Sequence, residues 1–105
     1  MKKSALPKNT QFFAAKYKNA WKAFEELGDQ CHNAGPLDDR TRRLIKIGVA
    51  TAAQSEGAVH SAVRQAKDVG LSADEIRHAI LLSLTTNGFP RAMAAMSWAD
   101  DILKK

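Results

Sequence analysis

The chain has 105 residues, of which 45% are hydrophobic, and this length suits a single domain because a second core is not expected below roughly 150 residues. It holds no run of about 18 apolar residues, and its N-terminus lacks the apolar segment of a secretory signal. We therefore expect a soluble cytoplasmic protein with no membrane partner. The single cysteine, Cys31, excludes an intrachain disulfide and a cysteine-based metal cluster.

The net charge of +5 comes entirely from the first half of the chain. Residues 1–50 hold ten Lys and Arg against five Asp and Glu, whereas residues 51–105 hold six of each. A basic segment with interleaved aromatic residues can bind nucleic acid, with lysines on phosphates and rings on bases. Helical spacing instead gathers the large apolar residues on one stripe, which favours a core face with a solvated basic back and no nucleic-acid partner. The stripe consists of Phe13, Tyr17, Ala20, Phe24 and Leu27.

The sequence predicts about five helices and no strand, so the fold class is all-α. A flexible basic segment over residues 1–9 precedes the first helix, which ends near Gly35. The second helix begins at Asp38 and Asp39, since acids suit a helix N-terminus. The third covers residues 55–69.

The last two helices follow Gly70, which stops the third. Ser72 and Glu75 form a capping box, in which each side chain bonds the other's free amide, and the fourth helix runs from there through residues 76–86. Gly88 breaks that helix and Pro90 opens the fifth. One face of the fifth helix gathers Ala92, Met96, Ala99 and Leu103.

The second and fourth helices are apolar nearly all round, over residues 44–53 and 79–84. A chain of this size cannot hide all of that surface within one subunit, so we expect a homo-oligomer. Phe89 sits at the bend between the last two helices, where it can wall a pocket or a subunit contact, although core packing is the favoured use.

The segment over residues 36–103 resembles the carboxymuconolactone decarboxylase family, which also holds the alkylhydroperoxidase D-like proteins. The likeness lies in the order of its parts: a Leu- and Ile-rich helix, "SEGA", Gly70, "DEIRHAI" and then a Gly-x-Pro turn. The resemblance implies one all-α domain of antiparallel helices over residues 1–105, assembled as a trimer or hexamer, with its site on the helix of residues 55–70.

The peroxidase branch of that family places an acid on the preceding helix, two thiols in a C-x-x-C pair and then a histidine. Those positions match Arg43, Ser55, Ala58 and Ala62, and all four depart from the family pattern. Peroxide reduction needs an attacking and a resolving thiol, so the sequence predicts no dithiol peroxidase activity. Cys31 is expected to be a small buried hydrophobe rather than a replacement thiol.

Glu56 and His60 stand four residues apart on the site helix, so the carboxylate can bond the imidazole and set its tautomer. This spacing makes them the candidate catalytic acid/base pair. The alternative is structural: Glu56 complements the helix N-terminus and His60 is a half-exposed partner. Spacing alone favours the structural alternative, and the resemblance narrows the difference, because "GAVHSAVR" is similar to a thiol-free branch with a histidine at this point.

Arg43, Lys46 and Ser55 are the candidate substrate-binding residues, with Arg43 able to grip a carboxylate in a bidentate pair. A solvated basic helix edge is the alternative for the two cations. An acid/base pair beside a carboxylate-binding arginine suits a cofactor-free enzyme that moves a proton in a small carboxylic acid or lactone. Such an enzyme is a decarboxylase, which is a lyase, or an isomerase.

The three histidines are scattered and make a poor metal set, although Glu56 and His60 can supply two ligands at a subunit interface. We therefore expect no metal and no cofactor. The competing hypothesis for function is a non-catalytic oligomer, a scaffold or a small-ligand binder on the same fold.

Overall fold

The computed structural model describes residues 6–104, which are helical nearly throughout and contain no strand. This confirms the all-α prediction. The described residues form two compact units, one over residues 6–37 and one over residues 38–104, which we call the N-terminal and C-terminal units. No helix in the described part of the chain is long and apolar enough to cross a membrane.

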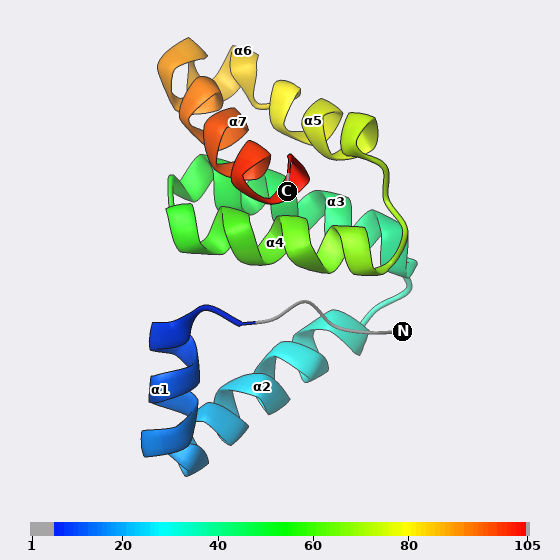
Figure 1. Ribbon diagram of the computed structural model, residues 1–105. Helices are drawn as coiled ribbons and strands as arrows, with labels where there is room; N and C mark the ends of the chain where they lie inside the picture. The colour runs from blue at the N-terminus through cyan, green and yellow to red at the C-terminus, as the bar shows by residue number, and fades with distance from the viewer. Residues whose placement is uncertain (1–5, 105) are drawn as a thin grey trace. The chain divides into compact units, whose positions relative to one another are not determined.

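The N-terminal unit holds α1 (Lys8–Lys16) and α2 (Lys18–Asn33), where the sequence predicted one continuous helix (Figure 1). The two helices separate because Tyr17 leaves helical geometry, with φ −116° and ψ 62°. Of the segment predicted to be flexible, residues 1–5 lie outside the described part of the chain. Residues 8 and 9 are already helical, so that prediction was too long at its end.

The aromatic stripe of the N-terminal unit is not a buried core, contrary to the prediction. Within the stripe the ring centroids of Phe13 and Tyr17 lie 5.2 Å apart, and Phe24 lies 5.7 Å from Trp21, an aromatic residue outside the stripe. Neither α1 nor α2 contains a buried residue, and Phe24 is 63% exposed. Cys31 is also exposed, so it is not the buried hydrophobe that we expected. Two short helices bury little surface against each other.

The C-terminal unit begins with α3 (Asp39–Ala53) and α4 (Glu56–Asp68), which pack side by side (Figure 1). Asp38 caps α3 by accepting the amide of Thr41 at 2.8 Å, as the acidic start predicted. Between the helices Gln54 adopts the left-handed conformation with φ 52°, and its side-chain amide donates to the carbonyls of Thr51 and Arg91 at 2.9 Å. These bonds hold the turn against the start of the last helix.

Helix α5 (Ala73–Leu81) opens with the predicted capping box, since the Ser72 hydroxyl accepts from the Glu75 amide at 3.1 Å and the Glu75 carboxylate from the Ser72 amide at 2.9 Å. The fourth predicted helix is in fact two, because α6 (Leu84–Asn87) follows separately. The Ser83 hydroxyl donates to the carbonyl of Ile80 at 2.7 Å and so competes with the helical ladder at this point.

Helix α7 (Phe89–Leu103) follows Gly88, whose φ of 94° explains the glycine at the break. Its inner face carries small side chains, with Ala92, Ala95 and Ala99 buried, which lets α7 lie close to α4. Met96 and Leu103, also predicted on this face, are partly buried against the core. Phe89 is 64% exposed, so its predicted core packing is wrong.

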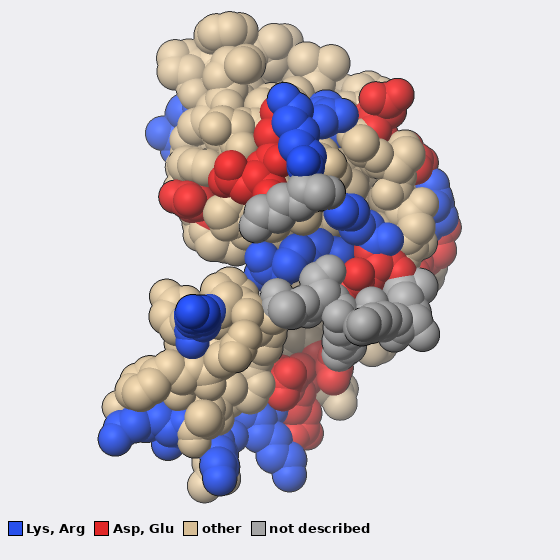
Figure 2. Space-filling model, in the orientation of Figure 1, with Lys and Arg blue, Asp and Glu red and all other residues tan. Residues whose placement is uncertain are grey.

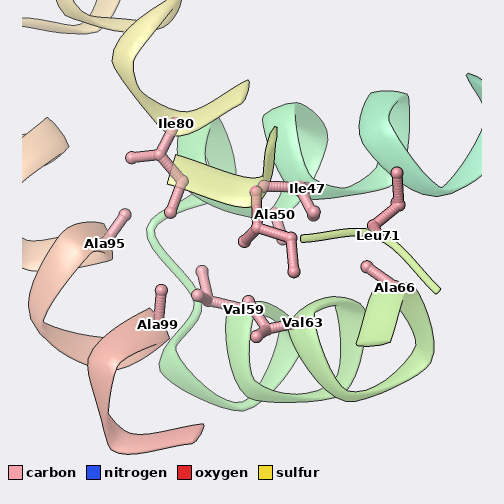
Figure 3. Packing of buried hydrophobic residues seen from close by; sticks show 10 residues of the cluster. Ile47, Ala50, Val59, Val63, Ala66, Leu71, Ile80, Ala95 and Ala99 are labelled. Carbon is pink, nitrogen blue, oxygen red and sulfur yellow. The ribbon is translucent and has the colours of Figure 1, made fainter. Parts of the chain in front are cut away.

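The core of the C-terminal unit lies between α3, α4, α5 and α7 (Figure 3). Its aliphatic side chains come from all four helices and from the α4–α5 turn, and several are fully buried. The cluster consists of Ile47, Ala50, Val59, Val63, Ala66, Leu71, Ile76, Ile80, Ala95 and Ala99. Because α4 and α7 share this core, the polar residues beside the contact have defined positions.

Candidate functional site

His60 lies on α4 with its imidazole directed at the end of α7. Its Nε2 atom lies 2.9 Å from Oδ2 of Asp101, a hydrogen-bond distance. The His60 side chain is 22% exposed and that of Asp101 is 51% exposed, so the imidazole is mostly covered and the carboxylate open. When Nε2 donates to the carboxylate, the free lone pair lies on Nδ1, which can take a proton from a substrate.

Glu56 lies one helical turn before His60 and completes a group of three. One oxygen of Glu56, one ring nitrogen of His60 and one oxygen of Asp101 all lie within 4.8 Å of one another. The sequence predicted Glu56 as the partner of the imidazole, but the hydrogen bond that His60 makes is to Asp101. The spacing of four residues along α4 brings the Glu56 carboxylate near the His60 imidazole. The packing of α7 against α4 brings the Asp101 carboxylate within hydrogen-bond distance of the same ring. We call Glu56, His60 and Asp101 the carboxylate–histidine cluster.

Asp101 was missed by the sequence analysis, and its neighbour shows why. Asp100 accepts a hydrogen bond from Arg77 of α5 at 2.9 Å, and this bond holds the pKa of Asp100 below its ordinary value. Successive helix residues are about 100° apart, so Asp100 faces α5 while Asp101 faces α4. The sequence shows two neighbouring acids beside the apolar face of the last helix. It does not show which residue either acid contacts.

Arg43 is not brought to His60. Its guanidinium donates to the side-chain oxygen of Gln65 on α4, and its Nε lies 3.8 Å from the carboxylate of Asp39. Gln65 follows His60 by five residues, a rotation of about 140° around the helix, so the two lie on opposite flanks of α4. The predicted carboxylate grip of Arg43 beside His60 therefore lacks the geometry that it needs.

The two other predicted substrate-binding residues also lie apart from the carboxylate–histidine cluster. The Ser55 hydroxyl accepts the amide of Ala58 at 3.2 Å and caps α4, which gives this serine a structural task. Lys46 is exposed on α3. Within α4, Ala58 is exposed and Ala62 is partly buried, so the positions that match the second thiol and the histidine of the peroxidase branch carry only methyl groups.

Arg64 is a cation that the sequence analysis did not select. It lies one turn beyond His60 on α4, at the spacing of four residues that brings side chains together. Arg64 is partly buried and makes no hydrogen bond or ion pair with any residue in the described part of the chain. The spacing of four residues places Arg64 and His60 on the same side of α4.

The C-terminal unit also contains an apolar groove of about 600 Å³ between α3, α5 and α6. None of its lining residues belongs to α4 or α7, so it is separate from the carboxylate–histidine cluster. Glu75 lies in its wall, where a hydrogen bond from the Ser72 amide and a second from Arg40 hold the pKa of the carboxyl below its ordinary value. The carboxylate–histidine cluster therefore lies outside this groove, whose lining also includes His78. Acidic and basic side chains lie next to one another on the face of this unit shown in Figure 2.

Residues 17–101 match the carboxymuconolactone decarboxylase family, and the protein belongs to that family. It is 29% identical over 82 residues to MJ0742, an uncharacterized protein of Methanocaldococcus jannaschii, across 77% of this chain and 79% of that protein. Its fold is similar to that of apo-lpg0406, a carboxymuconolactone decarboxylase family protein from Legionella pneumophila. That superposition has a TM-score of 0.76, covers 92% of this chain and 88% of the other, and pairs residues that are 19% identical, which shows a shared fold alone.

Proposed function

We propose that this family member is a cofactor-free acid/base enzyme that acts on a small carboxylic acid or lactone. The observation that carries the proposal is the hydrogen bond between His60 and Asp101, made across two helices that share one core. A histidine held by a carboxylate is an arrangement suited to moving a proton at a carbon next to a carbonyl group.

Each charged residue of the cluster has a role in this scheme. Asp101 fixes the tautomer and the orientation of His60, and His60 takes a proton at Nδ1 and returns it to a neighbouring atom of the substrate. Arg64, one turn along α4, binds the substrate carboxylate in place of Arg43, which Gln65 and Asp39 engage elsewhere. Glu56 is the second carboxylate available to the imidazole when it becomes charged.

Peroxidase chemistry of the dithiol kind does not fit the same site. The chain has one cysteine, and that residue lies on α2 rather than on α4. A thiolate that attacks peroxide becomes a sulfenic acid and needs a second thiol to release it as a disulfide. Acid/base chemistry does not need a thiol. The side chains on α4 and α7 therefore support acid/base chemistry better than peroxide reduction.

Ultraviolet turnover of 4-carboxymuconolactone and related lactone acids tests the proposal. We expect His60→Ala to lower kcat/KM by about 100-fold or more, whereas His32→Ala, a histidine change in the N-terminal unit, leaves it unchanged. Cys31→Ala serves as the thiol control and should also retain activity. Arg64→Gln should raise KM for the carboxylate substrate more than it lowers kcat. Equal turnover by the parent protein and His60→Ala would refute the assigned role of the imidazole.

A second candidate function is a non-catalytic homo-oligomeric scaffold, and the exposed apolar surface favours it. Two large side chains that line the groove between α3 and α5 are exposed to solvent, Ile45 by 48% and Leu82 by 68%, and Val49 on α3 is 60% exposed. A subunit of this size gains stability when a second copy covers such surface. Sedimentation of the parent protein beside Leu82→Glu tests the assembly, since a buried unpaired charge should dissociate it. An intact oligomer without turnover of any lactone acid would favour the scaffold.

A further inference from the structure

The carboxylate–histidine cluster combines side chains that metal ions prefer, and it is assembled from two helices. Glu56 and His60 come from one stripe of α4, and Asp101 comes from the end of α7, 41 residues away from His60 in the chain. We propose that Glu56, His60 and Asp101 bind a divalent first-row transition-metal ion, with zinc as the reference ion. This inference does not depend on the proposed reaction.

The spacing of the three groups is close to that of a coordination shell. Zinc bonds nitrogen and oxygen at about 2.0–2.2 Å, so the atoms that share one ion lie about 3 to 3.5 Å from each other. Nε2 of His60 and Oδ2 of Asp101 are already 2.9 Å apart, and the whole group lies within 4.8 Å. Glu56 is exposed and can close the remaining distance by a side-chain rotation.

The ligand types favour a transition metal over magnesium or calcium. Magnesium and calcium take shells of oxygen, whereas an imidazole nitrogen suits zinc, cobalt and nickel. Two carboxylates offset the charge of a divalent ion, and three protein ligands leave a fourth position for water or a small anion. Sequence spacing offered only Glu56 and His60, and the folded chain adds the third ligand.

The core beneath the cluster holds the two helices in place. Val59 is the residue before His60 and is 1% exposed, and Ala99 lies two residues before Asp101 and is fully buried. Both belong to the same core cluster, so the ligands on α4 and α7 cannot separate without opening that core. A site on packed helices loses little conformational freedom when an ion binds.

Metal binding and the proposed proton transfer exclude each other at His60. An imidazole that coordinates an ion through Nε2 gives up its hydrogen bond to Asp101, and the ion takes the carboxylate as well. The cluster therefore either binds a metal ion or acts in proton transfer, but it does not do both at once. Where the protein turns over a lactone acid, zinc should inhibit it, and removal of zinc by a chelator should restore the rate.

Calorimetric titration with zinc chloride, without any substrate, tests the binding separately from the reaction. The parent for this series is tag-free Cys31→Ala, because an exposed thiol is itself a zinc ligand. We expect one site per chain, confirmed by the visible absorption of bound cobalt. In this background His60→Ala, Asp101→Asn and Glu56→Gln should each weaken zinc binding by about tenfold or more. His32→Ala is the matched control and should bind as the parent does.

Two results of the titration would refute the metal site. If zinc binds the parent and His60→Ala with equal affinity, or if no ion binds at one per chain, the metal site is refuted. Circular dichroism of each variant checks that helices are retained, and the three independent substitutions prevent one poorly folded variant from deciding the result. Because no substrate is present, failure of the metal site leaves the proposed function standing, and failure of turnover leaves the metal site standing.

Discussion

Ile80 on α5 offers a quantitative test of the packing that positions the site. Its side chain is fully buried within the cluster that α4 and α7 share (Figure 3). Ile80→Ala removes three carbon atoms, worth about 2.5 kcal/mol in transfer free energy at about 0.8 kcal/mol for each. The cavity that remains adds to this cost, so the free energy of unfolding should fall by about 3 to 4 kcal/mol. Ile80→Val removes one carbon and should cost about 1 kcal/mol.

Urea denaturation, followed by circular dichroism at one fixed protein concentration, measures both changes. With an m-value of about 1.5 kcal/mol/M for a chain of this size, the Ile80→Ala midpoint should fall by about 2 M. Met93→Ala on α7 is the control, because that side chain is 47% exposed and its removal should cost about 0.5 kcal/mol or less. If Ile80→Ala costs no more than Met93→Ala, the assigned core is wrong.

Two further predictions concern local stability. Ser72→Ala removes the hydroxyl that accepts the Glu75 amide, and it should lower the free energy of unfolding by about 1 kcal/mol in the same urea assay, with Ser97→Ala on the exposed side of α7 as the control. Acid should destabilise the protein, because hydrogen bonds hold the pKa values of Glu75 and Asp100 below their ordinary values of 4.5 and 3.8. A lowered folded-state pKa gives stability that is present above the ordinary value and is lost as pH falls through the folded one, so the urea midpoint should drop below about pH 4. Arg77→Gln should reduce that drop, and an unchanged profile would argue against the Asp100 pair.

The helix ends of the C-terminal unit could be predicted because their causes are local. Asp38 and Ser72 each cap a helix through an amide only three residues away, and Gly70 and Gly88 supply the positive φ of two turns. Ser55 caps α4 in the same way, although the sequence had suggested it for substrate binding. Such bonds depend on residues within one turn of helix, which the sequence displays directly. The missing thiols were equally plain, since the number of cysteines is a property of the sequence.

Helix continuity was less predictable, because one residue can interrupt an otherwise regular stretch. Tyr17 and Ser83 lie where the sequence predicted unbroken helices, and each marks a break. The apolar spacing of the N-terminal unit correctly indicated a stripe but not what covers it. Periodicity reports which side chains share a face, and Phe24 shows that such a face can stand in solvent.

The sequence by itself determined the helical class, the caps at Asp38 and Ser72, and the absence of a dithiol site. Only the tertiary structure decided that His60 bonds Asp101 rather than Glu56, and that Arg43 bonds Gln65 on the opposite flank of α4. The physical reason is the range of each interaction. A cap closes over three residues of one helix, whereas a contact between α4 and α7 depends on how a shared core of small and branched side chains sets two helices against each other.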